Sequence, residues 1–366
     1  PLWELYIIEG LEDGGVAVLT KIHHACIDGV AGAEILGLLL DMSPEGTEIP
    51  EPETPWTPER EPTPIELVGR GGLGLLGRPR AAIRLARNTV PALPAITRNF
   101  NLPLPGVGTR EYPDEPMSAP ASTAPPTPFN GGITPHRRFA FGSQPLDDVK
   151  AVKTAFGSTV NDVVMTLCAG ALRQWLVDHD ALPDDPLLAM VPVSIRGDET
   201  GGDFGNQVST MVAALPTNLE DPVERLEHMA AEMRVAKEEH EALPAHLLQD
   251  FANFTPPSVL GVANRVVNLL ADRAASPFNV VISNVPGPQF PLYSLGAQLR
   301  GNYPLSAIAP GVGLNMTVMS YNGNLDWGLL ADRQMIPDIW DLYGHLDSEL
   351  ATLRKSARKT TRKAGR

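Results

Sequence analysis

The sequence predicts a mixed α/β protein with two domains, and three observations support this prediction. The chain has 366 residues, more than the roughly 250–300 residues at which a single core usually stops growing. From residue 136 onward, apolar residues alternate between strand and helix periodicity. A proline-rich stretch divides this part from the residues before it. We expect the end of a first domain over residues 1–45, a linker over 46–135, a second domain over 136–353 and a basic tail over 354–366.

The first predicted element is a strand over residues 16–22, whose almost continuous apolar run is typical of a buried strand. His23 and His24 follow at its exit, and a helix is predicted over residues 30–36. Adjacent side chains on a strand point to opposite faces. One histidine can therefore face a cavity while the other packs into the structure.

The segment between this strand and this helix allows three interpretations. A neutral imidazole accepts a proton near pH 7, which suits a general base. Histidine and aspartate also bind metals, but no further ligand stands at a helical spacing, and Cys26 and Cys168 lie far apart in the sequence. Finally, Asp28 can be a helix N-cap, with Gly29 easing the turn. The residue types alone leave all three interpretations open.

Residues 43–135 are predicted to connect the two domains, because prolines crowd both ends of this stretch. Between the prolines, residues 65–90 carry leucines and arginines. Such a basic amphipathic segment can lie on an anionic lipid surface, or it can be a solvated helix of the crossover. Glycines in its first half weaken it as a helix and favour the solvated alternative.

The second domain has a strongly predicted helix over residues 158–178, where apolar residues recur three and four positions apart. Another helix should start at Asp221, because this acid precedes a proline at the first helical position. Apolar patterns predict strands over 187–193, 208–215, 278–283, 313–321 and 325–330, and a closing helix over 336–353.

Two polar pairs stand at the ends of these elements. Asn161 and Asp162 lie in the first turn of their helix, where capping and the helix dipole account for both residue types. Ser283 and Asn284 follow an apolar strand and precede a Pro-Gly-Pro segment, which indicates a turn. Alternatively, their hydroxyl and amide groups donate to a developing oxyanion, a contribution often worth about 3 kcal/mol.

Composition excludes several classes of protein. The net charge of −14 argues against nucleic acid as the main partner, although the last 13 residues are basic and contain no acid. No apolar run approaches the roughly 18–20 residues that a membrane-spanning helix needs. Two cysteines cannot build a disulfide framework, which favours a cytoplasmic location.

Five motifs occur in one order along the chain: Pro1-Leu2-Trp3-Glu4, HHxxxDG at residues 23–29, Asn161-Asp162, Pro192–Arg196 followed by Gly205-Asn206, and Ser283–Pro288. In these motifs the chain resembles the bacterial wax ester synthase/diacylglycerol acyltransferase family. This family is a branch of the CoA-dependent acyltransferases, which include chloramphenicol acetyltransferase and peptide-synthetase condensation domains. HHxxxDG marks the wider superfamily, whereas the Asn-Asp pair and the last motif narrow the resemblance to this branch.

The resemblance implies a two-lobed acyltransferase fold of the chloramphenicol-acetyltransferase type. It also implies transfer of a long-chain fatty acyl group from acyl-CoA to diacylglycerol or a long-chain alcohol, making triacylglycerol or wax ester. His24 would be the general base, His23 mainly structural, and Asp28 an orienting residue beside Gly29, paired with Arg196. Asn161 and Asp162 would lie near the reaction channel. Neither a cofactor nor a metal is expected, because acyl-CoA is a substrate.

Two kinds of partner follow from the same resemblance. Family members carry further chain before the Pro-Leu-Trp segment, so we expect the first lobe to be incomplete here and a preceding segment of the same protein, in the same or a separate chain, to complete it. The expected substrates are nearly insoluble in water, which favours peripheral contact with the inner membrane or with lipid droplets. The segment over 65–90 and the basic tail are the candidate contact regions.

Three alternatives differ in function. An enzyme of the polyketide-associated or condensation type would take the acyl group from a carrier-protein thioester. A catalytically inactive lipid-binding protein would keep the fold, but it would have no need for His24. A metal hydrolase would contain bound metal.

Overall fold

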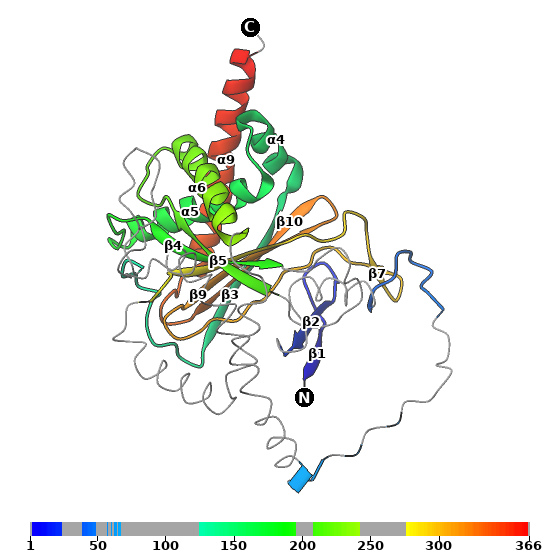
Figure 1. Ribbon diagram of the computed structural model, residues 1–366. Coiled ribbons are helices and arrows are strands. Elements are labelled where there is room, and N and C mark those ends of the chain that lie inside the picture. Colours follow the sequence, from blue (N-terminus) through cyan, green and yellow to red (C-terminus); the bar gives the residue numbers. More distant parts are fainter. Residues whose placement is uncertain are drawn as a thin grey trace.

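The computed structural model describes residues 2–23, 39–48, 57, 60, 62–63, 65–66, 124–194, 208–241 and 276–364 (Figure 1). A six-stranded sheet and four helices form most of the described part. The strands are β3 (Arg137–Pro145), β4 (Leu187–Ser194), β5 (Val208–Leu215), β6 (Val280–Val285), β9 (Leu314–Tyr321) and β10 (Asn324–Asp332). The helices are α4 (Leu146–Phe156), α5 (Val160–Asp178), α6 (Pro222–Glu241) and α9 (Ile339–Ala364). The mixed α/β class predicted from the sequence is confirmed.

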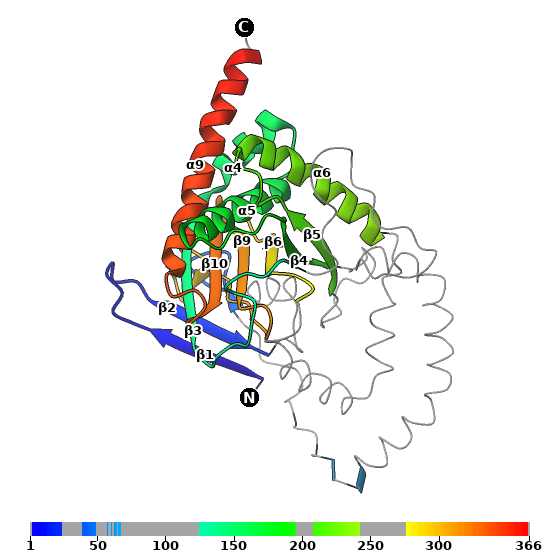
Figure 2. The ribbon, with the colours of Figure 1, turned by 90° about the vertical axis from the view of Figure 1, so that its left-hand side faces the viewer.

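The sheet is mixed and has the strand order β3-β10-β9-β6-β4-β5. The central pairs β4–β6 and β6–β9 are parallel, whereas the outer pairs are antiparallel. All four helices cover one face, as Figures 1 and 2 show. Side chains that alternate toward this face, such as Ile282, Met316 and Trp327, are fully buried. The main core therefore lies between the sheet and the helices.

Helix α5 lies at the centre of this core, as its periodicity predicted. It begins with a capping box, in which the Thr159 hydroxyl accepts from the Asp162 backbone N–H and the Asp162 carboxylate accepts from the Thr159 N–H. Thirteen of its residues are buried. No single helix in the described ranges is long and apolar enough to cross a membrane. Helices α4 and α5 together meet the length and composition criteria, but they meet at 102°.

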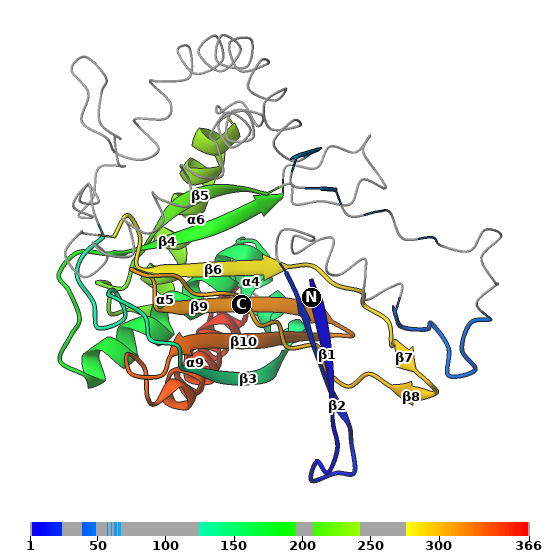
Figure 3. The same cartoon turned by 90° about the horizontal axis from the view of Figure 1, so that it is seen from below.

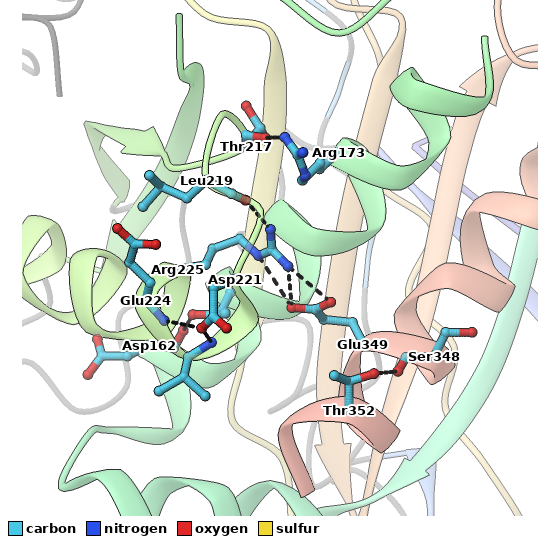
Figure 4. A network of polar contacts seen from close by, with 12 residues as sticks. Asp162, Arg173, Thr217, Leu219, Asp221, Glu224, Arg225, Ser348, Glu349 and Thr352 are labelled. Atoms are coloured by element: carbon cyan, nitrogen blue, oxygen red, sulfur yellow. Dashed lines mark hydrogen bonds and ion pairs between the residues drawn. The ribbon is translucent and has the colours of Figure 1, made fainter. Parts of the chain in front are cut away.

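Helices α6 and α9 are joined by a buried ion pair, which Figure 4 shows. The Arg225 guanidinium donates to both carboxylate oxygens of Glu349, at 3.0 and 3.3 Å, and also to the carbonyl oxygen of Leu219. Gly170 of α5 faces this carboxylate so closely that a Cβ at this position would collide with it. The pair thus fixes three helices relative to one another.

A separate hairpin precedes the main sheet. It consists of β1 (Trp3–Ile8) and β2 (Ala17–Ile22), and lies on the side of the sheet away from the helices (Figures 1 and 2). The predicted strand over 16–22 is confirmed, but its predicted burial is wrong, because Val18 is 56% exposed and Ile7, opposite to it, is 65% exposed. An almost continuous apolar run is suited to burial, but the strand is buried only where other parts of the fold cover it.

Two further differences concern the segments near the ends of the second domain. The closing helix, expected over 336–353, begins at Ile339 and continues to Ala364, so most of the predicted basic tail is helical. Strand β3 and helix α4 were not singled out in the sequence. A small hairpin of β7 (Tyr293–Ser294) and β8 (Ala297–Gln298) was also unexpected. The predicted helix over 30–36 and most of the 43–135 linker, including residues 67–90, lie outside the described residues.

Candidate active site

His23 is the first residue after β2, as predicted. Its backbone N–H donates to the Leu2 carbonyl oxygen across 2.8 Å, which extends the pairing of the hairpin by one residue. Its side chain lies in an exposed position. The remaining residues of the heptad named above, His24, Asp28 and Gly29, lie outside the described residues, as does Arg196.

Asn161 and Asp162 have different roles at the start of α5. Asp162 is 7% exposed, and its carboxylate completes the capping box with Thr159. Helix chemistry therefore accounts for Asp162, as expected. It does not account for Asn161, because the side chain that caps the helix belongs to Thr159.

Asn161 instead contacts the end of strand β6. The side-chain nitrogen of Asn284 donates to Oδ1 of Asn161 across 3.2 Å. Both residues are half-buried, and 123 residues separate them in the sequence. Two of the four polar residues proposed from separate motifs thus lie in direct contact.

Ser283 points to the other face of the sheet, because successive side chains on a strand alternate. It stands beside Thr317 of β9 in the parallel register. The Thr317 hydroxyl is held by Ser306 and Asn315, at 2.8 and 2.7 Å. By contrast, the half-buried Ser283 hydroxyl makes no hydrogen bond to the described part of the chain. Ser283 and Asn284 therefore cannot donate to the same substrate oxygen from this strand.

The Pro-Gly-Pro segment holds the end of β6 in place. The Gly287 N–H donates to the Ser320 hydroxyl across 3.1 Å. A Cβ at position 287 would collide with the carbonyl oxygen of Ser320, so only glycine allows this approach. In Figure 3 the strands are seen from the face that the helices leave open, with β6 ending beside β9. The structure assigns no turn to residues 286–288, where one was predicted, and β6 continues to Val285, so Ser283 and Asn284 lie within the strand and do not follow it.

Two buried acids were not recognised in the sequence. Burial raises the pKa of Asp326, whose carboxylate accepts from the Ser143 hydroxyl at 2.6 Å and from the Asn302 N–H at 2.7 Å. Burial also raises the pKa of Glu349, an effect that Arg225 opposes. Both acids connect elements of the fold. For Asp326 the residue pattern offered a weak signal, an acid between the apolar residues Leu325 and Trp327, which is equally typical of surface positions.

Within the described ranges, no three His, Cys, Asp or Glu side chains are grouped closely enough to hold a metal ion. His24 and Asp28 of the heptad lie outside these ranges.

Comparison with known proteins gives matches along most of the chain. Residues 1–164 match the wax ester synthase/diacylglycerol acyltransferase catalytic domain, and residues 204–354 match the C-terminal domain of the same family. Asn161 belongs to the first match, and Asn284 to the second. Their hydrogen bond thus joins the two matched segments.

Named relatives agree with these matches. A Mycobacterium tuberculosis protein that carries the name of a diacylglycerol O-acyltransferase is 39% identical over 347 residues, which are 93% of this chain and 64% of the relative. The chain thus spans somewhat less than two thirds of that relative. The O-acyltransferase WSD of Acinetobacter baylyi is 33% identical over 361 residues, which are 96% of this chain and 72% of the relative.

Solved structures support the two-lobed acyltransferase fold. The wax ester synthase/diacylglycerol acyltransferase of Marinobacter aquaeolei superposes with a TM-score of 0.64 at 31% identity, over 98% of this chain and 72% of that one. An epimerization domain of tyrocidine synthetase, at 14% identity and a TM-score of 0.50, shares the fold alone. The fold, the matched domains and the relatives together show that this chain belongs to the wax ester synthase/diacylglycerol acyltransferase family.

Proposed function

We propose that the protein containing this chain is an O-acyltransferase, which moves a long-chain fatty acyl group from acyl-CoA to diacylglycerol or a long-chain alcohol. The observation that carries the proposal is the complete HHxxxDG heptad within the segment that matches the family's catalytic domain. The names of the relatives, diacylglycerol O-acyltransferase and O-acyltransferase WSD, support the same reaction.

In the proposed reaction, His24 removes the hydroxyl proton of the acceptor alcohol as its oxygen attacks the thioester carbonyl. A tetrahedral intermediate forms, and its collapse breaks the carbon–sulfur bond. His24 then returns the proton to the departing CoA thiolate. One ester bond replaces one thioester bond, and neither a cofactor nor a metal takes part.

Asp28 and Ser283 support this chemistry in different ways. Asp28 orients the loop that carries His24 and is paired with Arg196, because an unpaired buried carboxylate is costly. Ser283 is the better oxyanion donor of its pair, since its hydroxyl lies on the face that the helices leave open and makes no hydrogen bond to the described residues. The amide of Asn284 is already engaged on the opposite face.

The deciding experiment measures product formation by the intact protein. Labelled palmitoyl-CoA is supplied with dipalmitoylglycerol or with hexadecanol, and lipid products are separated by chromatography. We expect triacylglycerol, wax ester or both. A parallel reaction with palmitoyl carrier protein in place of palmitoyl-CoA tests the other donor. Product only from the carrier protein would contradict the CoA proposal, and no product from either donor would contradict acyl transfer.

We also propose that the C-terminal part of α9 contacts anionic lipid. Arg354 is held by Asp148 of α4 at 2.8 Å, whereas Lys355, Arg358 and Lys359 are exposed. These basic residues line a groove of about 810 Å³ between α9 and α4. Figures 1 and 2 show that this end of α9 projects beyond the other helices. The proposed substrates are nearly insoluble in water, so contact with a lipid surface would give the enzyme access to them.

A second proposed partner is a preceding segment of the same protein, in the same or a separate chain. One face of the β1–β2 hairpin carries Trp3, Leu5, Ile7 and Val18, which are 46–66% exposed. Large exposed apolar faces of this kind mark interfaces. The relatives are longer than the part that this chain matches, so they have further residues that can cover such a face. Hydrogen exchange of the hairpin, measured with and without that segment, tests the proposal, and equal protection would contradict it.

A further inference from the structure

The contact between Asn161 and Asn284 determines which group of Asn161 is available to a ligand. Because Oδ1 of Asn161 accepts from Asn284, the NH2 group of Asn161 points away from Asn284. Neither of its hydrogens has a partner in the part of the chain that the structure describes. Asn161 therefore presents, from a half-buried position, two donors that none of the described residues uses.

The surroundings of the pair make this arrangement fixed. On one side, the capping box of Thr159 and Asp162 holds the first turn of α5. On the other side, the close approach of Gly287 to Ser320 holds the end of β6. The start of α5 and the end of β6 are thus each held by their own contacts. These contacts bring the amides of Asn161 and Asn284 together, so the hydrogen bond between them is not needed to join the two elements.

We propose that Asn284 is a positioning residue, which orients the amide of Asn161 so that its NH2 group donates to a carbonyl oxygen of the acyl-thioester substrate. This inference rests on the acyl transfer proposed above. The start of a helix carries partial positive charge, which strengthens a donor to a carbonyl oxygen there. CoA thioesters offer this acceptor in two places, the acyl carbonyl and the amide carbonyls of the pantetheine arm.

Two nearly isosteric substitutions separate a substrate role from a structural one. Asn161→Asp keeps the acceptor for Asn284 but removes the NH2 group, and an acid in the first turn suits the helix. Asn284→Asp cannot donate to Oδ1 of Asn161, so it accepts from the NH2 group and turns the amide around. Each substitution should lower kcat/KM at least about tenfold, while the melting temperature stays close to that of the parent.

Three control variants accompany them. Asn161→Leu removes the amide without adding charge and should lose as much activity as Asn161→Asp. Asn284→Gln keeps a donor and should retain more activity than Asn284→Asp. Asn324→Asp, at the start of β10, adds the same charge elsewhere and should behave as the parent. The inference would be wrong if Asn161→Asp retained the parent kcat/KM. It would also be wrong if Asn324→Asp lowered kcat/KM as much as Asn161→Asp does.

Binding of unreactive analogues separates this inference from the proposed function. A long-chain S-(2-oxoalkyl)-CoA keeps a ketone near the acyl carbonyl position, whereas the matching S-alkyl-CoA keeps only the arm amides. Weaker binding of the ketone analogue alone to Asn161→Asp would assign the acyl carbonyl, and equal weakening of both would assign the arm.

The outcomes for the parent protein are equally distinct. If the parent protein binds both analogues but forms no product, the proposed function is wrong. The role of Asn161 is then still decided by comparing analogue binding to the parent and to Asn161→Asp. A parent that binds neither analogue contradicts both proposals. Unchanged binding of both analogues by Asn161→Asp, together with unchanged turnover, overturns the role given to the pair.

Discussion

At the scale of single residues, the two adjacent histidines should respond differently to removal. His24→Ala should abolish acyl transfer with little loss of stability, because loss of a general base costs about 10²-fold or more in rate. The backbone N–H of His23 donates to Leu2, a bond that alanine would keep. The family resemblance gives the His23 side chain a mainly structural role, so His23→Ala should lower the melting temperature as much as the rate. Palmitoyl-CoA turnover and thermal unfolding of both variants check this. Purified His24→Ala with more than about a tenth of the parent rate would refute the base assignment.

Asp28 and Arg196 form the second prediction at this scale. Asp28→Ala and Arg196→Ala should each lower the melting temperature, since each would leave one charge of the proposed pair without its partner. The double variant should lose less stability than the sum of the single losses. Urea unfolding of the four proteins measures the coupling between them. Losses that simply add would show that the two side chains do not interact.

The residues of the proposed site could be predicted from the sequence, but the contact between them could not. The motifs identified Asn161 and Asn284 separately, because each stands at the end of a recognisable element. Their contact spans 123 residues and depends on how α5 packs against the sheet. No local pattern contains this information. The opposite directions of Ser283 and Asn284 follow from strand alternation, but only because β6 continues to Val285, beyond its predicted end at residue 283.

At the scale of elements, periodicity predicted most helices and strands of the second domain within a few residues. It missed β3, α4 and the β7–β8 hairpin, and it misplaced the end of α9. The expected end of α9 at Leu353 is where large apolar residues stop. Leu353 and Ala357 are both buried at a spacing of one helical turn, so the packed face continues on a small residue. Alanine is too weakly apolar to be noticed as part of a stripe, but it is the best helix former.

The joint between α6 and α9 supports a prediction at this scale. Arg225→Met should destabilise the protein by about 3–5 kcal/mol, because it leaves the Glu349 carboxylate buried without a partner. Adding Glu349→Met should restore much of the loss, since two apolar side chains can replace a buried ion pair. Urea unfolding followed by circular dichroism measures both effects. A double variant less stable than Arg225→Met would show that the pair is needed for more than charge balance.

At the scale of the whole molecule, the basic end of α9 should determine contact with lipid. Changing Lys355, Arg358 and Lys359 to Gln removes three exposed charges and leaves the Arg354–Asp148 ion pair in place. Each basic residue near an anionic surface contributes about 1 kcal/mol, so partition of the intact protein into anionic vesicles should fall roughly 100-fold at low salt. High salt should weaken binding of the parent toward the level of the variant, because charges separated by more than a Debye length are screened.

A matched variant removes three exposed arginines elsewhere, Arg138, Arg234 and Arg333, and therefore has the same net charge. Flotation of the parent and both variants with phosphatidylglycerol vesicles, at low and high salt, separates a local effect from a change in overall charge. We expect the matched variant to float like the parent, because its arginines lie outside the basic end of α9. Equal losses in both variants would assign binding to net charge alone. Binding insensitive to salt and to both sets of changes would instead assign it to apolar contacts, for which the exposed face of the β1–β2 hairpin is the strongest candidate.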